Sequence, residues 1–137
     1  KTNILHGFSG PTNVAVPGAL VTYTIRYDND TNGVGRFLNV IDYINTNKVR
    51  YALWSFQITP HTAAGAGNST REYWDGAGWL GAEPALPQNV LGVRLRVTTA
   101  VGDIPANNGD AGDTLAAVDG ANPDADAGSM TFQVYIR

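Results

Sequence analysis

The feature of this sequence that most restricts its fold is the strict alternation of apolar and polar residues in several short segments. In VTYTIRY, residues 21–27, apolar and aromatic residues alternate with two threonines and an arginine. The segments VRLRV, residues 93–97, and MTFQVYI, residues 130–136, follow the same pattern. Successive side chains of a β-strand point to opposite faces, so each segment is expected to bury one face and expose the other. Such alternation is typical of antiparallel sheets with one solvated face.

Other segments complete an all-β pattern. β-Branched and aromatic residues predict further strands at 36–44, 48–60, 72–74 and 114–118. The polar residues 45–47 are expected to form a hairpin turn between the first two of these. Gly, Pro and Asn punctuate the remainder, and no segment shows the period of an amphipathic helix. The sequence therefore predicts an all-β fold, an immunoglobulin-like antiparallel β-sandwich of about seven strands.

Length and composition narrow the functional classes. The chain has 137 residues, the length of one domain. A net charge of −3 without a Lys/Arg cluster argues against nucleic-acid binding, and no apolar run reaches the roughly 18 residues of a membrane-spanning helix. The absence of Cys excludes disulfides, thiolate metal sites and Cys nucleophiles, and is compatible with secretion. Because the chain starts at Lys1 without Met, we expect a product from which a signal peptide has been removed.

The opening segment is set apart from the alternating body. Ile4, Leu5 and Phe8 form a short apolar cluster, and the Ser-Gly-Pro break at 9–11 follows it. Two interpretations remain open. Residues 3–8 are either the first strand of the chain's own sandwich or a strand donated to a neighbouring subunit. On the second interpretation the chain divides into a donor strand and linker, 1–11, and a sandwich domain, 12–137.

One part of the sequence resembles a known family. Pro17 and Gly18 precede the alternating strand at 21–27, which ends near Asn29; a Gly-bearing turn at Gly33 or Gly35 and the segment NVID at 39–42 follow. With the closing segment at 128–136, this pattern resembles an immunoglobulin-like repeat domain of unknown function from prokaryotic surface proteins. It is also similar to subunits of extracellular filaments. The likeness covers about half of the chain, and the Trp-bearing middle and the acidic loop depart from it.

The resemblance implies a secreted structural module that polymerises by donor-strand complementation. A sandwich edge exposes unpaired backbone groups, and a strand from another chain can satisfy them. The expected donor residues are Ile4, Leu5, His6 and Phe8, with Leu5 on the face opposite to the other three. The expected acceptor groove is lined by Val21, Tyr23, Ile25, Met130, Phe132 and Val134. The C-terminal strand at 130–137 is a second candidate donor.

Two Asn-X-Ser/Thr triplets are candidate acceptors for N-linked glycans. Asn29 and Asn68 both lie in segments predicted to be exposed turns, where a glycan would be tolerated. The triplet is short and arises readily by chance, so its specificity is poor. The sequence favours Asn68 over Asn29, because the loop around Asn68 has no other evident purpose.

An acidic segment lies between Gly102 and Ser129 and contains six Asp residues with no basic residue among them. Carboxylate and amide oxygens at this density are ligands that Ca²⁺ prefers. If calcium binds anywhere, it is expected at Asp119, Asn122, Asp124 and Asp126, although the spacing does not match a helix-loop-helix calcium loop. The alternative is a solvated acidic loop without metal.

Aromatic residues suggest a second kind of surface. Trp54, Tyr73, Trp74 and Trp79 could form a sugar-stacking platform or an anchor at a subunit interface. Trp54 lies in a strand-like segment and is expected to pack in the core, whereas Trp74 and Trp79 flank a Gly-rich turn and are expected to be exposed.

Catalytic residues are few. His6 and His61 have no Ser or carboxylate neighbour in a known arrangement, and Glu72 and Glu83 form no recognisable glycosidase pair. The sequence therefore predicts a non-enzymatic, extracellular or cell-surface protein that assembles with itself into a homopolymeric pilus-like fibre. The alternatives are a monomeric secreted module that binds carbohydrate or a partner protein, and one module of a larger surface protein.

Overall fold

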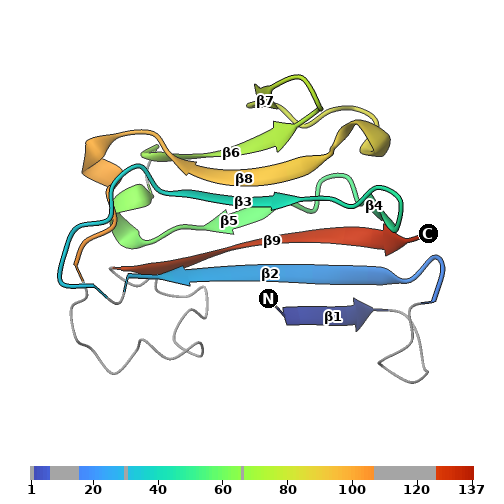
Figure 1. Cartoon of the computed structure of the whole chain (residues 1–137), viewed down its shortest axis with the longest axis horizontal. Helices are drawn as coiled ribbons and strands as arrows, with labels where there is room; N and C mark the ends of the chain where they lie inside the picture. Colours follow the sequence, from blue (N-terminus) through green and yellow to red (C-terminus); the bar gives the residue numbers. More distant parts are fainter. Residues whose placement is uncertain (1, 7–15, 30, 66, 107–125) are drawn as a thin grey trace.

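The computed structural model describes residues 2–6, 16–29, 31–65, 67–106 and 126–137, with the backbone alone for 2–6. Two antiparallel sheets pack as a sandwich (Figure 1). The first sheet contains β1 (Thr2–His6), β2 (Leu20–Asp28), β9 (Ala127–Ile136), β4 (Val49–Tyr51) and β5 (Gln57–Thr59). The second contains β3 (Asn39–Tyr43), β8 (Gly92–Val97), β6 (Ser69–Trp74) and β7 (Trp79–Leu80). The predicted all-β antiparallel sandwich is confirmed.

Short 3₁₀ turns accompany the strands. They are η1 (Thr62–Ala64), η2 (Pro87–Asn89) and η3 (Ala100–Gly102), and the described ranges contain no α-helix. No helix within those ranges is long and apolar enough to cross a membrane.

The pairing of β2 with β9 forms the centre of the first sheet. All nine residues of β2 have partners on β9, from Leu20 opposite Tyr135 to Asp28 opposite Ala127. Both strands have the alternating sequences, so their apolar residues lie on the same face in register: Val21 is opposite Val134, and Ile25 is opposite Met130. β4 and β5 both pair with the other edge of β9.

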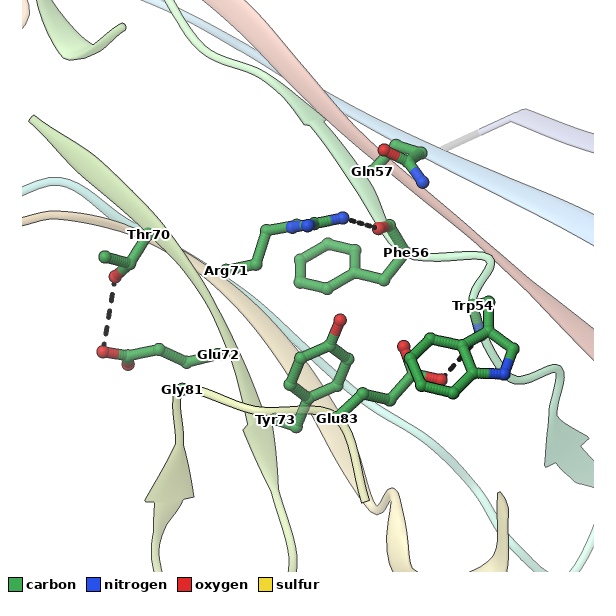
Figure 2. Close-up of a pocket in the computed structure, with 9 residues that line it drawn as sticks. All are labelled: Trp54, Phe56, Gln57, Thr70, Arg71, Glu72, Tyr73, Gly81 and Glu83. Carbon is green, nitrogen blue, oxygen red and sulfur yellow. Dashed lines mark hydrogen bonds between the residues drawn. The ribbon is translucent and has the colours of Figure 1, made fainter. Parts of the chain in front are cut away.

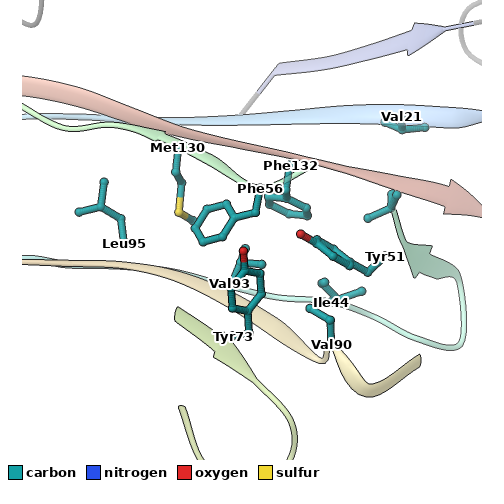
Figure 3. Close-up of a cluster of buried hydrophobic side chains, with 11 residues drawn as sticks. Val21, Ile44, Tyr51, Phe56, Tyr73, Val90, Val93, Leu95, Met130 and Phe132 are labelled. Carbon is teal, nitrogen blue, oxygen red and sulfur yellow. The ribbon is translucent and has the colours of Figure 1, made fainter. Parts of the chain in front are cut away.

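The core lies between β9 and β8 (Figure 3). Val93 and Leu95 of β8 and Met130 and Val134 of β9 are fully buried, as the alternation predicts. Tyr51, Phe56 and Tyr73 fill the space beside them, and the rings of Phe56 and Tyr73 meet edge to face with their centroids 5.6 Å apart. Each buried side chain of this size stabilises the fold by about 1.5–3 kcal/mol.

Two sequence predictions about the segment 45–60 are wrong. Residues 48–60 do not form one long strand, because β4 and β5 are separate short strands joined by an excursion at 52–56. Residues 45–47 do form a tight turn, in which the Asn47 N–H donates to the Asn45 side chain. This turn joins no hairpin, since β3 and β4 belong to different sheets.

The loop after β2 is anchored by a buried amide. The sequence placed Asn29 in an exposed turn, but its residue surface is only 9% exposed. Its Nδ2 donates to the Gly33 and Pro105 carbonyls at 2.8 and 2.6 Å, and its Oδ1 accepts from the Thr31 hydroxyl at 2.6 Å. A paired bridge between Gly35 and Ile104 joins the same two loops, and a Cβ on Gly35 would clash with the Ile104 side chain.

A second buried polar group lies nearby. His61 is fully buried, with Nε2 2.8 Å from the Gly102 carbonyl and Nδ1 2.9 Å from the Tyr27 hydroxyl. A carbonyl can only accept, so Nε2 carries the proton and Nδ1 accepts from Tyr27. Burial lowers the pKa of His61, although the backbone at Gly102 and the carboxylates of Asp103 and Asp126 oppose this shift.

The Asn29 network leads to a first prediction. Asn29→Ala should lower the free energy of unfolding by about 1–3 kcal/mol, because two loop carbonyls lose their buried donor. The control is Asn47→Ala at an exposed turn, which should change stability by less than about 0.5 kcal/mol. Chemical denaturation of both variants measures the difference, and equal effects would contradict the anchoring role of Asn29.

The His61 environment leads to a second prediction. Because the folded protein holds His61 neutral, the unfolded chain binds more protons below the ordinary pKa of 6.5. Stability should therefore be fully present well above the ordinary pKa and fall as the pH drops through it toward the lowered pKa of the folded protein. His61→Gln should flatten this slope in urea titrations at several pH values. A slope that survives the substitution would assign the pH dependence to other groups.

Candidate functional site

The segment expected to be a donor strand lies at the edge of the first sheet. β1 pairs antiparallel with β2, with Ile4 opposite Thr22, Leu5 opposite Val21 and His6 opposite Leu20. It occupies the end of the sheet order, so its other edge meets no strand of the described chain. Phe8 lies outside the described residues. The edge of β2 that does not pair with β9 therefore accepts β1 (Figure 1).

The residues predicted to line an acceptor groove lie together on the inner face of β2 and β9. Val21, Met130, Phe132 and Val134 are buried in the core, whereas Tyr23 and Ile25 are half-buried against it. Tyr23 stacks on Phe132 with ring centroids 5.3 Å apart. Beside this pair is a hollow of about 160 Å³, which the end of β3 lines from the second sheet.

A larger groove lies on the opposite side of the sandwich, between β5 of the first sheet and β6 of the second (Figure 2). It measures about 520 Å³. Figure 2 shows Arg71 and Gln57 toward one side, Trp54 and Glu83 toward the other, and the rings of Phe56 and Tyr73 between them. The Arg71 guanidinium crosses between the sheets and donates to the Phe56 carbonyl at 2.9 Å.

Trp54 stands at the tip of the excursion between β4 and β5, and the prediction that it packs in the core is wrong. The residue is 74% exposed and has a positive φ of 63°. Ser55 fixes the excursion, because its hydroxyl donates to the Ala52 carbonyl at 2.5 Å and accepts from the Gln133 N–H at 2.9 Å. The apolar run ALW at 52–54 resembles a buried strand, and the sequence alone gives no sign of the excursion.

Glu83 is the acidic group of the groove. Its Oε1 accepts from the backbone N–H of Trp54 at 2.6 Å, and its Oε2 lies 3.4 Å from the Tyr51 hydroxyl. Burial, together with the Glu83 charge, raises the pKa of Tyr73 to about 12 and also raises that of Tyr51. Both phenols therefore stay protonated near neutral pH beside the carboxylate.

Trp74 and Trp79 do not form an open platform. Both are half-buried on the outer face of the second sheet, where their rings are tilted by 47° to each other. The Arg94 guanidinium covers the Trp79 ring at 4.2 Å and forms an ion pair with Glu72. The Glu72 carboxylate is therefore already paired with Arg94, and it also lies 3.5 Å from the Arg96 guanidinium.

The remaining predicted sites are only partly described. Asn68 is half-buried, its Nδ2 donates to the Ala63 carbonyl at 3.0 Å, and its Oδ1 accepts from the Thr99 hydroxyl at 2.7 Å. Within the described ranges, the second Nδ2 hydrogen of Asn68 has no acceptor, whereas both Nδ2 hydrogens of Asn29 are used. Of the calcium candidates, Asp119, Asn122 and Asp124 lie outside the described residues. Asp126 is buried, and the described part of the chain contains no cluster of three metal-ligating side chains.

Comparison with known proteins assigns no family to this chain. The chain matches no protein-family model, no curated protein and no solved structure. The fold and the geometry above are therefore the basis for any functional proposal.

The backbone of Trp54 leads to a third prediction. A left-handed conformation costs a non-glycine residue about 1–2 kcal/mol, and the exposed indole offers little burial to offset this. Trp54→Gly should therefore be more stable than Trp54→Ala by up to about 1 kcal/mol. Thermal unfolding of the two variants measures the difference, and an alanine variant at least as stable as the glycine variant would contradict the backbone strain.

Proposed function

We propose that this chain is a structural, non-catalytic subunit of an extracellular filament, and that subunits polymerise by exchanging β1. The observation that supports the proposal best is the place of β1 at the sheet edge, where it pairs with β2 over five residue positions. The same register is available whether residues 2–6 come from the same chain or from a second copy. When each copy donates β1 to the next copy and accepts it from another, the contact is head-to-tail, and where it does not close into a ring it propagates as a fibre.

Surface composition agrees with the proposal. Charged residues make up only 15% of the sequence, which leaves surface suited to packing against neighbours. Phe37 and Val101 are 78% and 76% exposed, on the two loops joined by the Gly35–Ile104 bridge. Exposed apolar side chains of this size favour contact with another subunit.

Introduced cysteines test the exchange directly, because the natural chain contains none. The double variant Ile4→Cys/Thr22→Cys places thiols at register partners. If β1 is exchanged between copies, oxidation should produce a ladder of covalent multimers on a non-reducing gel. The matched control is Ile4→Cys/Thr24→Cys, which is two residues out of register and whose thiols are too far apart to cross-link efficiently.

Two further results complete the test. Negative-stain electron microscopy of the natural chain should show fibres of regular width, and deletion of residues 1–10 should abolish them. The deletion variant should remain folded, since β2, β4, β6, β8 and β9 supply most of the described core. A monomer with only an intramolecular disulfide, together with an absence of fibres, would overturn the proposal.

A further inference from the structure

The groove between β5 and β6 contains a residue, Trp54, whose conformation and exposure do not stabilise the fold. Trp54 is held in an unfavourable left-handed conformation while most of its surface faces solvent. The hydrogen bonds of Ser55 and Glu83 maintain this conformation through the backbone, not through the indole. The indole itself is thus presented at the groove without contributing much to the core.

The polar groups of the groove have capacity for a ligand. A guanidinium has five N–H donors, and Arg71 uses one of them, toward the Phe56 carbonyl, among the described residues. The exposed Gln57 amide makes no side-chain hydrogen bond within the same ranges. On the other side, the Glu83 carboxylate has lone pairs beyond those used by the Trp54 backbone N–H and the hydroxyls of Tyr51 and Tyr73.

These groups select a class of ligand by their chemistry. Hydroxyl groups both donate and accept, so a polyol can satisfy Arg71 and Gln57 on one side and Glu83 on the other. Arg71 and Glu83 give the groove charges of both signs, so an anionic ligand attracted by one is repelled by the other, which favours a neutral ligand. The apolar face of a sugar ring can stack on an exposed indole, and about 520 Å³ falls within the usual size range of small-ligand sites.

We propose that this groove is a binding site for neutral glycans, in which Trp54 stacks on a sugar ring while Arg71, Gln57 and Glu83 bind its hydroxyl groups. A peptide strand added to the edge of β5 is the competing occupant. The geometry favours the sugar, because Arg71 already occupies the Phe56 carbonyl at that edge. The inference does not rest on the proposed filament.

The test is a titration of the full chain with neutral tetrasaccharides built from glucose, mannose or xylose. Binding is followed by the indole N–H signals in two-dimensional NMR spectra. At least one neutral tetrasaccharide should bind and shift the Trp54 signal. Trp54→Ala should weaken that binding by about tenfold or more, whereas the matched control Trp79→Phe, at a ring already covered by Arg94, should bind as the natural chain does.

A second variant distinguishes a loss of binding from a loss of folding. Gln57→Ala changes an exposed side chain, so it should keep the natural unfolding temperature and still weaken binding several-fold. The inference is overturned if no neutral tetrasaccharide binds, if Trp54→Ala binds equally well, or if only a sulfated tetrasaccharide or a peptide of residues 1–10 binds. Fibre formation by Trp54→Ala should match that of the natural chain, so failure of this inference is distinguishable from failure of the filament proposal.

Discussion

The pairing of β2 with β9 is the constraint on which the rest of this structure depends. It joins segments about a hundred residues apart in the sequence and aligns two alternating strands so that their apolar residues share one face. That face supplies Val21, Met130, Phe132 and Val134 to the core, and the other edge of β9 receives both β4 and β5. A shift of one residue in this register would turn every apolar side chain of β2 away from the core.

Both candidate sites lie at the edges of the sheets. At one edge, β2 accepts β1, which is the pairing that a filament would exchange between subunits. At the other side, the second sheet continues from β6 to β7 while the first sheet ends at β4 and β5. The groove therefore lies where one sheet stops before the other, and Arg71 and Glu83 close it only in part. Sandwich edges expose backbone groups and side chains that the core does not use, and so they are available for function.

Buried polar groups hold the loops at one end of the sandwich. Asn29 and His61 are both enclosed, and each connects loops distant in the sequence through hydrogen bonds to backbone carbonyls. Neither residue looks different in the sequence from an exposed polar residue, and Asn29 was expected in an exposed turn. The partners that bury them, Pro105 and Gly102, are more than forty positions away.

The sequence by itself determined the strands whose alternation is strong. The β2, β8 and β9 segments and their buried residues follow from a period of two, because a strand with one apolar face must bury that face. Only the tertiary structure decided the break between β4 and β5, the exposure of Trp54 and the burial of Asn29. Each of these depends on a distant partner, such as the Gln133 N–H for the excursion at 52–56 and the Pro105 carbonyl for Asn29. Local pattern carries no information about such partners, so the groove could not be predicted from the sequence.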